Sequence, residues 1–349
     1  MIPTALLNLL PYADASPALA GPLRFAGAGH AIIGRATLGH EAWIGAGAVM
    51  RADGHSVQAG DDLHLGRGAS VHIAHEVYPA VIGHRVTVGA NAVVHACTVH
   101  DDCVIEEDCV ILDGSVLAAG VVLEAGSVVF PRSELPGGWL YAGKPARPVR
   151  ELAPADLIAR RAALRARNEA AAHDWQGSDR APRIDATAFI ANTALLRGRV
   201  AVQAQGSVWY GCRLDGSAGQ IAVGARSNVQ DNSVLTAGAG GIRIGVDSTI
   251  GHNVTMEDCS IGDRCLIGIG SRVAPGTVAQ DDSFLAAGAV TTPGQVLESG
   301  FLWGGTPARK LSPLDERKKA LVLSTIVTYC DYAERLGQAQ AAVARTRAA

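Results

Sequence analysis

Two matching sets of charged side chains could do chemistry in this chain. Arg51 and Asp53 form an Arg-x-Asp motif, and Arg213 and Asp215 form a second one, 162 positions further along. An arginine paired with a carboxylate makes a charge-assisted hydrogen bond, which is stronger than a neutral one and can hold two segments against each other. The chain also has 11 histidines, whose imidazoles can bind a metal or act as general bases.

The offset of 162 recurs beyond these motifs and indicates two copies of one domain. The further repeated residues are Gly89 and Gly251, Cys97 and Cys259, Cys103 and Cys265, and the pentapeptides 143–147 and 305–309. Two domains are the expected number for a chain of 349 residues. We predict a first domain over 1–173, a linker over 174–182 and a second domain over 183–349.

Apolar residues recur at every sixth position in each copy. In the first copy they are Ile82, Val88 and Val94, then Val104, Val110, Val116, Val122 and Val128; in the second they are Ile244, Ile250 and Met256, then Ile267 and Val273. A step of six fits neither a helix, which needs 3.6, nor a half-buried strand, which needs 2. It is typical of a coil that turns one small apolar residue inward at each corner. We therefore predict a mainly β fold, with two parallel β-helices in tandem.

One α-helix is predicted after each coil. The segment 151–173 is rich in Ala, Leu and Arg, lacks Gly and has Pro154 near its start. Its arginines are predicted to form a solvated face. The second helix is predicted to open with Ser312 as its N-cap and Pro313 as its first residue. Its apolar residues, expected along the flank of the coil, are Leu321, Ile326, Val327 and Tyr332.

Composition restricts the partners and the compartment. The net charge is −3 with mixed signs, so we predict neither a nucleic-acid nor a membrane partner. No apolar run approaches the roughly 20 residues of a membrane span. Cys97, Cys103 and Cys109 fall at or beside inward positions, and seven is an odd number of cysteines. We therefore predict core thiols in a reducing compartment and a cytoplasmic location.

A set of ordered motifs carries a family resemblance. In the second copy they are Ser207-Val208-Trp209-Tyr210-Gly211, Arg213-Leu214-Asp215, Ser227-Asn228-Val229-Gln230-Asp231, Ile250-Gly251-His252 and Gly305-Thr306-Pro307-Ala308-Arg309. In the first copy they are Val49-Met50-Arg51-Ala52-Asp53, Val88-Gly89, His95-Ala96-Cys97 and Tyr141-Ala142-Gly143-Lys144-Pro145. In this order, over nearly the whole chain, both copies resemble the γ-class carbonic anhydrases, which are left-handed parallel β-helices built from hexapeptide repeats.

The resemblance implies a metal enzyme made of several chains. In that family three chains pack around a three-fold axis, and three histidines from two neighbours hold a zinc ion. Three imidazoles leave a position open for water, whose pKa the zinc lowers to about 7. The implied reaction is the reversible hydration of carbon dioxide or a related small carbonyl by a lyase of the carbonate dehydratase type. The implied metal is zinc, with iron or cobalt as alternatives, and the implied assembly is a homo-oligomer of three chains or a multiple.

The first copy keeps only part of the family's ligand set. His95 stands at the position of the second ligand. His75 fits the position of the first ligand best, and His72 is the alternative. Where the family has a Gly-His pair, the first copy has Gly89 and Ala90.

The second copy shows the opposite losses. His252 keeps the Gly-His pair, but Glu257 and Thr236 replace the other two histidines. The resemblance therefore implies one site that combines His75 and His95 of a first-copy face with His252 of a second-copy face.

Other residues match family positions with stated roles. Asn228, Gln230 and Asp231 match residues that orient the bound hydroxide and the substrate. Arg51, Asp53, Arg213 and Asp215 match an Arg-x-Asp pair that the family places across its subunit interface, whether or not a metal binds.

Two other functions stay open. One is a non-catalytic assembly or scaffold subunit that has lost its metal ligands. The other is a hexapeptide acyltransferase with a histidine as its general base, which would need a long loop over the acyl donor. Kinship of fold alone is a weak warrant for a reaction.

Overall fold

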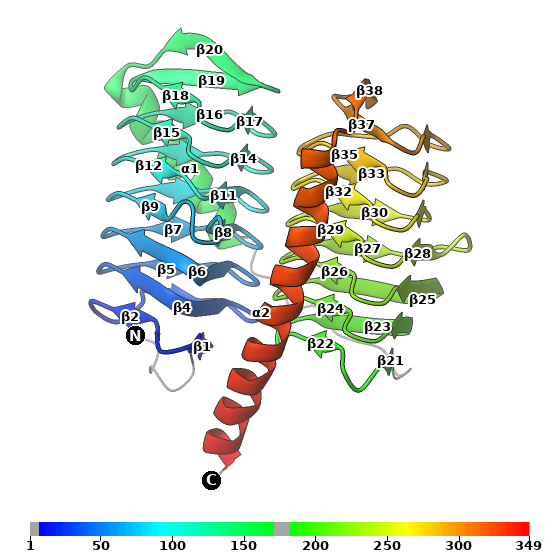
Figure 1. Cartoon of the computed structure of the whole chain (residues 1–349). Coiled ribbons are helices and arrows are strands. Elements are labelled where there is room, and N and C mark those ends of the chain that lie inside the picture. Colours follow the sequence, from blue (N-terminus) through cyan, green and yellow to red (C-terminus); the bar gives the residue numbers. More distant parts are fainter. Residues whose placement is uncertain (1–6, 171–181, 349) are drawn as a thin grey trace. The chain divides into compact units, whose positions relative to one another are not determined.

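The chain folds as two compact units, Met1–Asp174 and Trp175–Ala349. The computed structural model describes residues 7–170 and 182–348. Each unit is a parallel β-solenoid with a helix after it (Figure 1). The predicted fold class, mainly β with two β-helices in tandem and a helix after each, is confirmed. The predicted linker over 174–182 lies outside the described residues, except for residue 182.

The first unit has two sheets of mostly two- or three-residue strands. The strands of the first sheet are β1 (Leu9–Leu10), β2 (Ala18–Leu19), β4 (Ala31–Leu38), β6 (Val49–Ala59), β8 (Ser70–His72), β9 (Ala80–Ile82), β11 (Val93–His95), β12 (Thr98–Val99), β14 (Val110–Ile111), β15 (Val116–Leu117), β17 (Val128–Val129) and β18 (Glu134–Leu135). Those of the second are β3 (Phe25–Ala26), β5 (Trp43–Ile44), β7 (His64–Leu65), β10 (Thr87–Val88), β13 (Val104–Ile105), β16 (Val122–Leu123), β19 (Trp139–Gly143) and β20 (Ala146–Glu151).

The second unit repeats this plan. The strands of its first sheet are β21 (Arg183–Ile184), β23 (Leu195–Val202), β25 (Arg213–Val223), β27 (Val234–Thr236), β28 (Ile242–Ile244), β30 (Thr255–Glu257), β31 (Ser260–Ile261), β33 (Arg272–Val273), β34 (Val278–Ala279) and β36 (Val296–Leu297). Those of its second are β22 (Phe189–Ile190), β24 (Ser207–Val208), β26 (Asn228–Val229), β29 (Thr249–Ile250), β32 (Leu266–Ile267), β35 (Phe284–Leu285), β37 (Phe301–Gly304) and β38 (Arg309–Pro313).

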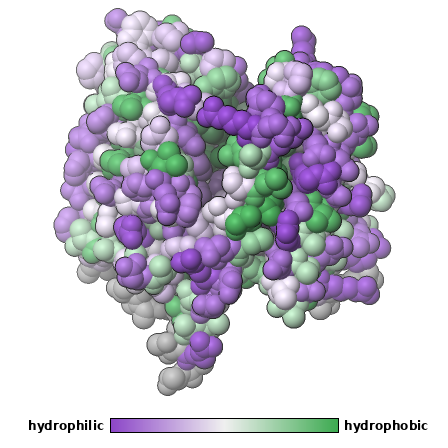
Figure 2. Space-filling view, in the orientation of Figure 1, coloured by the Kyte–Doolittle hydropathy of each residue, from purple (hydrophilic) through white to green (hydrophobic). Residues whose placement is uncertain are grey.

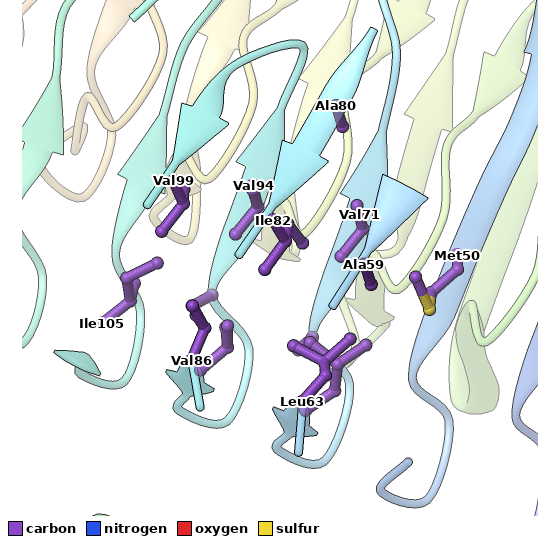
Figure 3. Close-up of a cluster of buried hydrophobic side chains, with 14 of the residues drawn as sticks. Met50, Ala59, Leu63, Val71, Ala80, Ile82, Val86, Val94, Val99 and Ile105 are labelled. Carbon is purple, nitrogen blue, oxygen red and sulfur yellow. The ribbon is translucent and has the colours of Figure 1, made fainter. Parts of the chain in front are cut away.

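The core confirms the predicted coil, but it corrects which residue of each six-residue step points inward. The inward residues of the later turns are Ile105, Ile111, Leu117, Leu123 and Val129. The predicted series starting at Val104 is therefore one residue out of phase. The inward residues Val94 and Val99 are five positions apart instead of six, which shifts every later turn by one (Figure 3). Val104 and Val122 are buried too, but in a separate cluster with Leu164 of the helix.

Helix α1 (Pro154–Ala170) is held to the first solenoid by charge, which corrects the predicted solvated face. Four of its arginines pair with carboxylates of the coil. The pairs are Arg160 with Glu106 at 2.6 Å, Arg161 with Asp102 at 2.7 Å, Arg165 with Asp62 at 3.0 Å and Arg167 with Glu107 at 2.6 Å. The prediction was wrong because single-sequence patterns do not show that coil corners present acids to the helix.

Replacing Arg165 by lysine is expected to loosen α1 by roughly 1–2 kcal/mol, because lysine cannot reproduce the guanidinium fork. Arg165 donates to the Thr87 hydroxyl, to both Asp62 carboxylate oxygens and to the Asp62 carbonyl oxygen. The matched control is Arg167→Lys, whose side chain is 51% exposed and whose ion pair is expected to contribute less than about 0.5 kcal/mol. Hydrogen exchange of the α1 amides measures both, and equal effects would contradict the prediction.

Helix α2 (Glu316–Ala348) begins later than predicted. Asp315 is its cap, since its carboxylate accepts the backbone N–H of Lys318 at 2.8 Å, whereas Ser312 and Pro313 belong to β38. The residues buried against the coil are Val322, Ile326, Tyr329, Tyr332 and Leu336.

The N-terminal part of α2 carries exposed apolar side chains. Val327 is 70% exposed, and Leu321 and Leu323 are exposed beside it (Figure 2). Of the predicted apolar residues of this helix, Ile326 and Tyr332 therefore face the coil, and Leu321 and Val327 do not.

The three cysteines placed at or beside inward positions by the sequence are core thiols, as predicted. Cys97, Cys103 and Cys109 belong to the main hydrophobic cluster of the first unit. Burial raises the pKa of the Cys109 thiol to about 12, so it stays neutral. Neither helix of the described chain is both long and apolar enough to cross a membrane.

Candidate functional site

One column of polar side chains in the first unit is set by strand register. In β6, β8 and β11, Arg51 pairs with His72 and His72 with His95. Paired residues of parallel strands point to the same face of a sheet. His72 and His95, 23 positions apart in sequence, thus become direct neighbours in space.

The two imidazoles face each other at a distance that suits a shared metal. His72 Nδ1 and His95 Nε2 are 3.2 Å apart. Two nitrogens bound to one tetrahedral zinc at about 2.0–2.1 Å would be roughly 3.3–3.4 Å apart. His72 is buried and His95 is half-buried. This donor pair therefore fits two of the ligands of a zinc site.

The outer nitrogens of the pair are bound to carboxylates. His95 Nδ1 lies 2.6 Å from Asp113 Oδ1, and His72 Nε2 lies 3.3 Å from Asp53 Oδ1. Arg51 donates to the other oxygen of Asp53 at 2.8 Å, and both of these side chains are fully buried. Carboxylates that hold the far nitrogen of a histidine fix its ring orientation, as they do around metal ligands.

The structure brings His72 beside His95, and it does not bring His75 there. Strand β8 ends at His72, and His75 follows in a turn closed by an isolated bridge between Ala74 and Tyr78. The His75 side chain is 45% exposed and lies 3.9 Å from Glu76. The alternative ligand, His72, is therefore the one whose position suits the site.

The register also separates the two Arg-x-Asp motifs. In the second unit Asp215 pairs with Thr236, and in the first unit Arg51 pairs with His72. Because Thr236 stands at the register position of His72, Arg51 stands at the position of Asp215 and not at that of Arg213. The offset of 162 fails here because the first copy has a longer turn after β8. His72 and His95 are 23 positions apart, whereas the corresponding Thr236 and Glu257 are 21 apart. Asp215 instead lies 3.7 Å from Arg197.

The second unit builds a site around its retained histidine. His252 Nδ1 lies 3.2 Å from Asp231 Oδ2, and the Tyr329 hydroxyl lies 3.4 Å from His252 Nε2. Asp231 is fixed in turn by the backbone N–H of Tyr210 at 3.0 Å. All these side chains are buried. The sequence did not point to Tyr329, because it comes from α2, 77 positions beyond His252.

The other predicted residues of this unit lie close by. Gln230 donates its side-chain N–H to Asn228 Oδ1 at 3.0 Å, and both are buried; Asn228 lies in β26, and Gln230 and Asp231 follow that strand. Thr236 and Glu257 occupy the register positions that His72 and His95 hold in the first unit, and both are exposed.

His64 is a buried histidine outside this column. Its ring stacks on Trp43 at 4.2 Å, and its Nδ1 lies 3.4 Å from the Arg24 guanidinium. Burial, together with the positive charges of Arg165 and Arg24, lowers the pKa of His64 to about 3. It is therefore neutral near pH 7 in the folded protein.

We expect His64 to make the first unit sensitive to acid. The folded pKa lies below the unfolded value of 6.5, so the unfolded chain binds the proton first as the pH falls. The stabilisation is complete above about pH 6.5 and falls by about 1.4 kcal/mol per pH unit toward pH 3. When the pH falls from 6.5 to 4.5, the free energy of unfolding, measured with urea, should fall in both proteins. The fall should be smaller in His64→Phe than in the parent chain by roughly 2.5 kcal/mol. Trp43→Phe, which keeps His64, is the control; equal losses in the parent and His64→Phe chains would contradict this.

Comparisons with known proteins agree with the repeats. The family model for the hexapeptide repeat of succinyl-transferase matches residues 79–112 and 259–293, one stretch in each solenoid. The mitochondrial protein gamma carbonic anhydrase 1 of Arabidopsis thaliana is 34% identical over 163 residues, which are 45% of this chain and 59% of the relative. Gamma carbonic anhydrase 2 of the same plant is 29% identical over 163 residues. The chain thus spans less than two thirds of these curated relatives.

A solved structure is also similar in sequence. The hexapeptide transferase family protein from Anaplasma phagocytophilum is 36% identical with a TM-score of 0.43, and the match covers 44% of this chain and 91% of that one. The repeat matches, the curated relatives and the two solenoids support a γ-carbonic-anhydrase-like hexapeptide-repeat protein in two copies.

Proposed function

We propose that the chain is a metal-dependent lyase that reversibly hydrates carbon dioxide or a related small carbonyl. The observation that carries the proposal is the pair of facing nitrogens, His72 Nδ1 and His95 Nε2, at 3.2 Å, each ring held from behind by a carboxylate. The names of the Arabidopsis relatives supply the reaction class.

The proposed third ligand is His252 of a second-unit face. Two histidines do not complete a catalytic zinc site of the three-histidine type. Asp231 Oδ2 lies 3.2 Å from Nδ1 of His252, so the proposed ligating atom is Nε2, which the Tyr329 hydroxyl approaches to 3.4 Å. Each unit lacks the histidines that the other unit keeps. In the first unit Ala90 follows Gly89, where the second unit has His252 after Gly251. In the second unit Thr236 and Glu257 stand at the register positions of His72 and His95.

The donor set favours zinc, with iron or cobalt as alternatives. Neutral imidazole nitrogens bind all three metals. A bound zinc would supply hydroxide near neutral pH. Asp53 and Asp113 would hold the ligand rings, and Asn228, Gln230 and Asp231 remain the proposed residues that orient hydroxide and substrate.

The proposed setting is a homo-oligomer of three chains or a multiple in the reducing cytoplasm. The resemblance to γ-carbonic anhydrases supports the assembly, and the buried thiols support the compartment. The proposed roles of Arg51 and Asp53, and of Arg213 and Asp215, at a chain interface belong to this assembly.

Metal analysis of the purified protein, together with stopped-flow carbon dioxide hydration, tests the function. We expect a fixed stoichiometry of zinc and activity that a chelator abolishes and zinc restores. A protein without metal or activity after zinc addition would overturn the proposal in favour of a scaffold. Acyl transfer from an acyl-coenzyme A without hydration activity would favour the acyltransferase.

A further inference from the structure

We propose that Asp113 is the positioning residue that fixes the tautomer and orientation of His95 for metal binding. This inference rests on the proposed metal site. Asp113 Oδ1 lies 2.6 Å from His95 Nδ1, the shortest of the contacts described around this pair of histidines. A carboxylate only accepts, so His95 Nδ1 carries the proton. The lone pair then lies on Nε2, the nitrogen that faces His72.

The coil holds the backbone of Asp113 in a fixed place. Asp113 lies in the turn that follows β14, and its carbonyl oxygen accepts the backbone N–H of Arg132 at 2.8 Å. The next residue, Gly114, donates its N–H to Ala96 O at 2.8 Å and has a φ of 69°, which favours glycine. The turn is thus bonded to the turns on both sides. A side chain on such a rigid corner can set the direction of an imidazole ring.

The second copy gives an internal comparison. Strand pairing places Val93 beside Val110 in the first unit and Thr255 beside Arg272 in the second. Counting forward from Val110 to Asp113 and equally far from Arg272 shows that Pro275 stands at the position of Asp113. In the same way, Glu257 stands at the position of His95. The copy that lacks the histidine also lacks the carboxylate behind it. This joint absence supports a role of Asp113 toward the histidine.

Cobalt titration of the full chain tests the inference through the visible absorption of the bound ion. We expect Asp113→Ala to weaken cobalt binding roughly 10- to 100-fold. Asp113→Asn should fall between this variant and the parent protein, because its amide oxygen still accepts from Nδ1–H. The matched control is Asp108→Ala, which removes a corner carboxylate that accepts from Asn91 at 2.6 Å. We expect parent-like cobalt binding from the control.

Two measurements on protein kept metal-free with a chelator separate this positioning role from a structural one. The melting temperatures of Asp113→Ala and Asp108→Ala should match within error. Nitrogen NMR of ¹⁵N-histidine-labelled, metal-free protein, assigned with His95→Gln, should show the Nδ1–H tautomer at His95 in the parent and its loss in Asp113→Ala.

The outcomes are distinct. If the parent binds no cobalt, the proposed function fails, whatever the tautomer. If the parent binds cobalt and Asp113→Ala binds it equally well, or if the tautomer does not change, the positioning role is wrong. A fall in melting temperature that accounts for the lost binding would also overturn it.

Discussion

Replacing His95 by alanine is expected to leave a folded protein that lacks the proposed metal and nearly all of the proposed hydration activity. The imidazole supplies one of the two facing nitrogens, and a single remaining histidine of the pair cannot hold zinc in a catalytic geometry. Since a bound metal would supply the hydroxide, the rate should fall by at least roughly 10³-fold. Zinc content and stopped-flow carbon dioxide hydration measure the two effects. His84→Ala, which removes a half-exposed histidine elsewhere on the coil, is the control.

The same assays separate the proposed ligands. His72→Ala and His252→Ala should behave as His95→Ala does, and His75→Ala should keep metal and activity. Full metal content in His252→Ala would show that the site does not need a second-unit face. Loss of metal in His75→Ala but not in His72→Ala would show that the first histidine had been chosen wrongly from the register.

The periodicity of six predicted the solenoid because each strand of the coil needs an inward apolar residue, whatever the rest of the sequence does. It did not predict which of two adjacent apolar residues faces inward. At Val104-Ile105 and Val122-Leu123 both residues are buried, one in the core and one toward α1. A single short corner between Val94 and Val99 changed the phase, and hydrophobicity alone carries no signal for that corner.

The site was predicted less completely, for reasons of register and distance. A longer turn after β8 made His75 fit the family pattern better than His72, although strand pairing selects His72. The constant offset of 162 places Thr236 opposite Ala74, so the sequence alone did not single out His72. Asp113 and Tyr329 reach their histidines from the next turn and from α2, and a short motif does not contain such partners.

Replacing Arg51 by methionine is expected to destabilise the first unit by about 3–5 kcal/mol, because it leaves a carboxylate buried without its cation. Arg51 and Asp53 are 2.8 Å apart and both side chains are fully buried. The matched control is Arg197→Met, which breaks a pair 3.7 Å apart whose side chains are about one third exposed, and which should cost less than about 1 kcal/mol.

Hydrogen exchange of the β6 and β8 amides in the presence of chelator reports this loss separately from metal binding. The double variant Arg51→Met with Asp53→Leu should recover much of the stability, since apolar side chains of similar size often replace a buried ion pair without loss. It should not recover metal binding, because His72 would no longer have its carboxylate. If Arg51→Met were as stable as Arg197→Met, the ion pair would be incidental to the fold, and the orientation of His72 would need another cause.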